Sequence, residues 1–170
     1  MKNYACKRRA MLAYFKNNLL FSTILFFIAI GSGMIIFRTE KLVIYPHRQA
    51  FFTLLYNNFL VCLTIMIAGI LSFGILGNFV LFANGVIVGR IIIGVFSLYG
   101  MKPLLHYLAP HFIFEISALI IATVISQETY KFFYNLRHVD IKIIYLRYDL
   151  EAFLIMNILL VVAALIESNL

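Results

Sequence analysis

The feature that most constrains the fold is a run from Ala50 to Gly100 in which Arg90 is the only Asp, Glu, Lys or Arg. As one helix rising about 1.5 Å per residue, this run would extend about 75 Å, more than twice the bilayer hydrocarbon core of about 30 Å. The run must therefore fold back on itself, and Gly74 and Gly77 supply residues for a tight reversal. We expect two membrane-spanning helices, near 51–72 and 79–99.

The rest of the chain has the composition of a membrane protein. Of its 170 residues, 64% are hydrophobic and 12% are charged, against about 25% charged in soluble domains. A core this small cannot bury 17 Phe and 10 Tyr, so lipid is the predicted solvent. This excludes a cytosolic enzyme, a secreted disulfide scaffold and a nucleic-acid-binding domain, and the net charge of +7 belongs to basic residues beside apolar runs.

Three further apolar runs are candidate transmembrane helices: 19–37, 104–126 and 150–167. The first follows a basic leader, 1–18, and Pro110 either starts or kinks the second. In the segment 127–149 charges alternate with apolar residues, which predicts a cytoplasmic amphipathic helix at the interface. The predicted fold class is all-α, a polytopic integral membrane helical bundle of about five transmembrane helices in a single domain, 1–170.

The distribution of Lys and Arg predicts an orientation with the N-terminus inside and the C-terminus outside. Nine basic residues then lie inside and four outside: Lys2, Lys7, Arg8, Arg9, Lys16, Lys131, Arg137, Lys142 and Arg147 against Arg38, Lys41, Arg48 and Lys102. This asymmetry follows the excess of basic residues in cytoplasmic segments. The basic flanks are also expected to contact anionic lipid head groups.

Two ionisable residues, Arg90 and Glu115, are predicted to lie at membrane depth, with His111 one turn from Glu115. Each such charge costs at least about 2.5 kcal/mol on insertion scales, so it should face protein or water. The simplest interpretation is that Glu115 neutralises Arg90 where the third and fourth spans pack. The alternative is that His111 and Glu115 form a proton relay or part of a metal site, although a metal would need more ligands.

Residues with short side chains or amides are predicted to pack helices or bind a partner: Asn57, Asn58, Gly69, Gly74, Asn84, Gly85, Gly89, Pro110 and Ala118. Gly85 and Gly89 form a small-xxx-small pair, which lets another backbone approach closely. We interpret this pair as a helix-packing site first and a homodimer contact second.

The sequence lacks the short motifs of membrane and soluble enzymes. It has no H-E-x-x-H, no G-x-S-x-G and no glycine-rich phosphate loop. We therefore expect no catalytic residue, no metal and no cofactor.

Several of these residues stand in an order that resembles the stage II sporulation protein M family. They are Asn57-Asn58, Gly69 and Gly74, Asn84-Gly85 with Gly89, and Pro110-His111-x-x-x-Glu115-Ile116-x-Ala118, with Phe112 where the family usually has Gly. The resemblance covers roughly 51–122. It implies a multi-pass protein of the bacterial cytoplasmic membrane without catalytic activity, which in sporulating relatives tethers peptidoglycan-degrading partners.

Two functions from different classes fit these features. The first is a non-enzymatic scaffold or accessory subunit that assembles with other membrane proteins. The alternative is a subunit of an ATP-driven export complex, or a small proton-coupled carrier that uses Arg90, His111 and Glu115. The first loop is short, whereas a stable soluble interface needs about 800 Å² per side. Partners are therefore expected inside the membrane: other membrane proteins, transporter subunits or a second copy.

Overall fold

The computed structural model describes residues 2–40, 50–129 and 143–169. Its elements are α1 (Lys2–Ile36), α2 (Phe51–Leu71), α3 (Ile75–Tyr99), α4 (Met101–Pro103), the π-helix η1 (Leu104–Leu108), α5 (Ala109–Gln127) and α7 (Ile143–Ser168). The described residues contain helices and no strand, which confirms the all-α fold.

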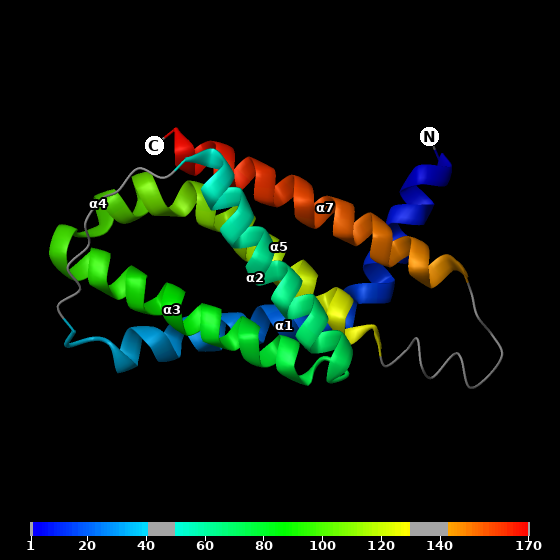
Figure 1. The fold of residues 1–170 in the computed structure, drawn as a ribbon, viewed down its shortest axis with the longest axis horizontal. Coiled ribbons are helices and arrows are strands. Elements are labelled where there is room, and N and C mark those ends of the chain that lie inside the picture. The colour runs from blue at the N-terminus through cyan, green and yellow to red at the C-terminus, as the bar shows by residue number, and fades with distance from the viewer. Residues whose placement is uncertain (1, 41–49, 130–142, 170) are drawn as a thin grey trace.

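Five helices in the described part of the chain are long and apolar enough to cross a membrane, as predicted. These spans are Tyr14–Ile36, Phe51–Leu71, Ile75–Tyr99, Met101–Gln127 and Arg147–Ser168. Figure 1 shows an elongated bundle in which the α2–α3 turn and the end of α5 lie at one end, and the C-terminus and the end of α3 lie at the other. The chain reverses direction after α1 and again at the α2–α3 turn, so α1 and α3 run in the same direction along the bundle.

The last span is longer than the apolar run that predicted it. Helix α7 begins at Ile143, so residues 143–149 belong to it rather than to a separate amphipathic segment. Arg147 and Glu151, one turn apart in α7, form an ion pair of 3.2 Å, which suits a helix end at the bilayer surface. At the other end of the predicted segment, Gln127 is the last residue of α5, and residues 130–142 lie outside the described residues.

Pro110 lies in the first turn of α5, directly after η1, so it stands inside a continuous helical segment and its missing N–H leaves one helical hydrogen bond unmade. The turn before it is widened into η1, and the Ala109 N–H donates to the carbonyl oxygen of Leu104, five residues back. Proline clashes with the carbonyl four residues earlier, and a wider turn relieves such a clash. The fourth span therefore crosses as one helical rod with a π-helical segment.

The reversal between α2 and α3 is made by two residues in the left-handed region, Phe73 (φ 54°) and Gly74 (φ 91°). The Gly74 N–H donates to the Gly69 carbonyl at 2.7 Å, which closes the end of α2. On the other side, the Asn78 amide donates to the Gly74 carbonyl at 2.8 Å. The predicted reversal at this glycine is confirmed, since a side chain at Gly74 would be strained at this φ.

Helices α1 and α3 touch backbone to backbone. A Cβ atom added to Gly33 of α1 would collide with the Val86 carbonyl of α3, and one added to Gly89 of α3 would collide with the Ile30 carbonyl of α1. Gly85 is buried in the same contact. The predicted packing role of Gly85 and Gly89 is thus seen, but their neighbour is α1 of the same chain, so this face is filled and offers no homodimer contact.

A second close contact holds α5 against the α2–α3 hairpin. The Ser126 side chain lies between Gly69 and Gly77, and a Cβ added to Gly77 would stand 2.6 Å from the Ser126 Oγ. Helix α5 also contributes to both apolar cores: Ile120 and Val124 pack with Phe26 and Leu81, whereas Ala118 and Ala122 pack with Cys62, Ile65 and Met156. It is therefore the central helix of the bundle.

Two glycines of α1 allow a matched test of the α1–α3 contact. Gly33→Ala should destabilise the protein by about 1–3 kcal/mol, because the methyl group has to displace α3. Gly31→Ala should be neutral or stabilising, by up to about 1 kcal/mol, because a Cβ at Gly31 meets open space and Ala favours a helix. Thermal unfolding in detergent measures both, and equal effects would contradict the packing.

Candidate functional site

Arg90 is paired with Glu40, not with Glu115. Its Nε donates to Glu40 Oε2 at 2.8 Å and its Nη2 donates to Glu40 Oε1 at 2.5 Å. The guanidinium also lies over the Phe37 ring, 5.1 Å from its centroid. The predicted neutralisation of Arg90 by Glu115 is therefore wrong.

The reason lies in the reach of the arginine side chain. Arg90 sits on α3 beside α1, and its head group extends past Ile36, the last residue of the α1 span, to Phe37 and Glu40. A long cationic side chain can thus leave membrane depth without moving its helix. The position also places a positive charge near the carboxyl end of α1, which favours cations.

Glu115 points the other way, toward α2 and α7. Asn58 on α2 donates a short hydrogen bond from Nδ2 to Glu115 Oε1. Cys62 is buried one turn after Asn58 on α2, and Glu167, near the end of α7, is close enough to act electrostatically on the same carboxyl group. We call Asn58, Cys62, Glu115 and Glu167 the acidic cluster. Among the described residues, the Glu115 carboxyl group accepts its hydrogen bond from an amide rather than from a cation, which separates this site from an ordinary structural ion pair.

His111 is buried, with 6% of its surface exposed. Within the described part of the chain its Nδ1 has no hydrogen-bond partner at normal geometry, although the side chain interacts with the backbone of Tyr107 one turn earlier. Its ring meets the edge of Phe112, with centroids 4.9 Å apart. Among the side chains that the structure describes, 14–40, 50–129 and 147–169, no group of three or more His, Cys, Asp or Glu is arranged to hold a metal ion.

A network of amides, which sequence analysis did not find, ties three helices together near the α2–α3 turn. Gln127 of α5 donates from Nε2 to Ser22 Oγ of α1 at 3.0 Å and to Asn78 Oδ1 of α3 at 2.8 Å. Beside it, Asn18 of α1 donates to Glu128 at 2.7 Å. In the sequence, these contacts are indicated only by polar residues near the ends of three apolar runs, 19–37, 79–99 and 104–126. We call these residues the end network.

The side chains of the two neighbouring asparagines, Asn57 and Asn58, lie on different faces of α2. Asn58 is turned inward to Glu115, and Cys62 and Gly69 on its face are buried, as their spacing predicted. Asn57, 100° further round the helix, is exposed and has no hydrogen bond to any described residue. Asn84 of α3 uses its amide within its own helix, donating to the Val80 carbonyl at 2.9 Å.

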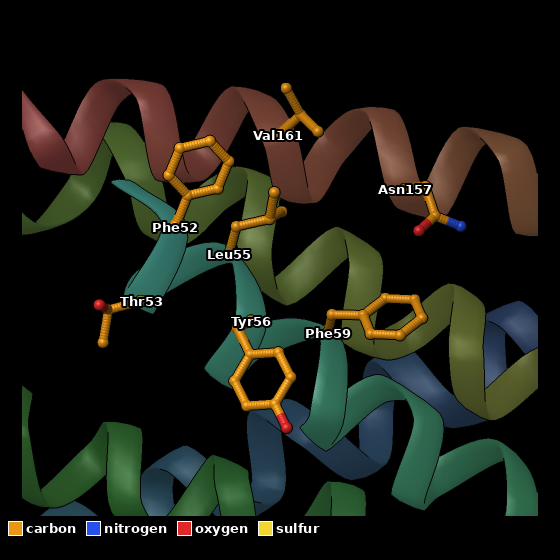
Figure 2. A pocket seen from close by; sticks show the side chains of 7 residues that line it. All are labelled: Phe52, Thr53, Leu55, Tyr56, Phe59, Asn157 and Val161. Carbon is orange, nitrogen blue, oxygen red and sulfur yellow. The ribbon is translucent and has the colours of Figure 1, made fainter. Parts of the chain in front are cut away.

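A groove between α2 and α7 is open to the bilayer side of the bundle. Figure 2 shows the residues that line this cavity of about 630 Å³: Phe52, Thr53, Leu55, Tyr56, Phe59, Asn157 and Val161. Phe52 and Tyr56 are 79% and 62% exposed. Asn157, near the middle of the last span, donates one hydrogen bond from Nδ2 to the Phe153 carbonyl of its own helix. The groove thus combines aromatic walls with an amide at membrane depth.

Comparison with protein families gives a match over most of the chain. The family model described as stage II sporulation protein M matches residues 22–170, which include the C-terminal part of α1, residues 22–36, and every later helix. No curated protein and no solved structure matches the chain.

The two possible partners of Arg90 can be separated by double-mutant cycles. Glu40→Gln and Arg90→Gln should couple by about 0.5–1 kcal/mol, a modest value because both side chains are about 40% exposed. Glu115→Gln and Arg90→Gln should be additive within about 0.5 kcal/mol. Unfolding in detergent with increasing dodecyl sulfate measures both cycles. Coupling in the second cycle and none in the first would contradict the observed pairing.

Proposed function

This chain belongs to the stage II sporulation protein M family, and on that basis we propose that it is a non-enzymatic integral membrane scaffold, an accessory subunit that assembles with other membrane proteins. Its five apolar helices support a place in a membrane. We further propose that this is the bacterial cytoplasmic membrane, with the N-terminus inside and basic flanks on anionic lipid.

One observation carries the proposal: several polar side chains in and beside the spans join helices of the same chain. Arg90 joins α3 to the segment after α1, Glu115 joins α5 to α2, and Gln127 joins α5 to α1 and α3. Such contacts fix the relative positions of the helices and hold their outer faces in place. A bundle with fixed outer faces is what a scaffold needs.

The groove between α2 and α7 supports a partner inside the membrane. Its aromatic walls, Phe52, Tyr56 and Phe59, offer a large apolar surface at low cost in side-chain entropy. Asn157 adds an amide that can accept a hydrogen bond at membrane depth, where water does not compete. We propose that the partner presents a transmembrane helix with a small or polar residue at the depth of Asn157.

A second candidate function rests on the acidic cluster. Glu115 lies in the middle of the fourth span, and among the described residues it accepts a hydrogen bond from an amide, Asn58, and lies near a second carboxyl group, Glu167. Ionisable residues inside membrane proteins often bind protons that move through them. This observation favours a small proton-coupled carrier, or a carrier-like subunit of an export complex, as the second candidate.

The scaffold proposal is tested by placing a photoreactive benzophenone side chain at Phe52 or at Phe79 in cells of the native host. Both phenylalanines are exposed, at 79% and 68%, but only Phe52 lines the groove. We expect a discrete protein adduct from position 52 that is several-fold weaker when Asn157→Leu is also present. Equal adducts from both positions, or lipid adducts alone, would contradict a partner in the groove. Transporter ATPase subunits in the adduct would indicate transport, and cell-wall hydrolases would indicate tethering.

The carrier function is tested in liposomes that contain the purified protein and a pH-sensitive dye. If Glu115 carries protons, an imposed voltage that is negative inside the liposomes should acidify the lumen. Glu115→Gln should abolish this proton flux without unfolding the protein. Glu151→Gln is the control, because Glu151 pairs with Arg147 at the helix end. The scaffold proposal predicts no flux above that of empty liposomes in any of the three proteins.

A further inference from the structure

One face of α2 is turned away from the bundle along its whole length. Its residues follow one another at alternating steps of four and three and are all exposed: Thr53, Asn57, Leu60, Thr64, Ile67 and Leu71. We call this set the α2 seam. The opposite face of the helix is buried, including Leu54, Ile65 and Gly69. A repeat averaging 3.5 residues is the spacing at which two helices pack side by side with interlocking side chains.

The seam contains a polar group that the described part of the bundle leaves without a partner. Asn57 lies six residues after Phe51, so it is about 9 Å below the start of the span and within the hydrocarbon core. Its amide is exposed and makes no hydrogen bond with any part of the chain that the structure describes. By contrast, Thr64 on the same seam donates to the Leu60 carbonyl at 2.8 Å. A side-chain amide facing lipid is costly, and a neighbouring helix that bonds to it removes the cost.

We propose that a second copy of this chain docks along the α2 seam, as a parallel pair of α2 helices whose Asn57 amides bond to each other. An amide carries both donors and an acceptor, so Asn57 is complementary to itself. Copies of one membrane protein insert in the same orientation, and a two-fold axis along the membrane normal therefore brings both Asn57 residues to the same depth. The helix of a different protein would have to match depth, spacing and hydrogen bonding separately.

The neighbouring side chains allow such a pair to form. Thr53, one turn before Asn57, and Thr64, two turns after it, are short and permit close approach of the helices. A buried asparagine at one such position also fixes the register of paired helices. The α2 seam shares only Thr53 with the groove between α2 and α7, so a dimer leaves most of that groove accessible. The dimer therefore goes beyond the proposed scaffold function and does not depend on it.

The test is disulfide crosslinking in membranes that contain the whole chain with Cys6→Ser, where the buried Cys62 is retained. Single cysteines are introduced at Leu60, Ile67 or Ile70. Ile67 and Ile70 are matched, since both are exposed isoleucines of α2, at 51% and 45%, but Ile70 lies outside the seam. After oxidation, Leu60→Cys and Ile67→Cys should give at least about five times more crosslinked dimer than Ile70→Cys.

The role of Asn57 is tested in the same membranes. Asn57→Leu should weaken the association roughly five- to tenfold, as expected for the loss of two interhelical hydrogen bonds, and Asn57→Gln should restore part of it. Because Asn57 is exposed, thermal unfolding of the monomer should be unchanged, which separates lost assembly from misfolding. Equal crosslinking at Ile67 and Ile70, crosslinking that Asn57→Leu does not reduce, or crosslinks from the seam to another protein would each overturn the proposal.

Discussion

The bundle depends on the close contact of α1 and α3 at Gly33, Gly85 and Gly89. In lipid, an apolar side chain gains little by leaving the acyl chains, so helices associate through van der Waals contact and hydrogen bonds instead. Glycines bring two backbones together and raise the number of such contacts. The same principle holds α5 in place, where Ser126 fills the space that Gly69 and Gly77 leave open.

Polar side chains then determine which helices meet and which surfaces remain available. In the end network, Gln127 bonds to two helices at once and is a structural element. In the acidic cluster, Glu115 accepts a hydrogen bond from an amide and lies near a second carboxyl group. This arrangement is compatible with the proposed binding and release of a proton. Asn57 faces outward, where another helix can pair with it. Of two neighbouring residues of α2, Asn58 thus packs the bundle internally and Asn57 is available for the proposed assembly with a second copy.

Features that depend on length and local backbone could be predicted from the sequence. The five spans follow from hydropathy, the reversal at Gly74 from the glycines, and the start of α5 from Pro110. Pairings between distant helices could not, because they depend on which faces meet. Arg90 was assigned to Glu115 since both were charges in apolar runs, but its long side chain reaches Glu40 in the segment that follows α1. Charged residues such as Arg147 likewise hid the true start of α7.

The most direct test of this account is a solid-state NMR measurement of the contact between arginine side-chain nitrogens and glutamate carboxyl carbons in bilayers. The Arg90 signal is assigned by its loss in Arg90→Gln. We predict that this Arg90 contact disappears in Glu40→Gln and persists in Glu115→Gln, because Glu40 holds the guanidinium. A contact that persists in Glu40→Gln and disappears in Glu115→Gln would contradict the account, since it would place the Arg90 head group against α5 rather than beside the end of α1.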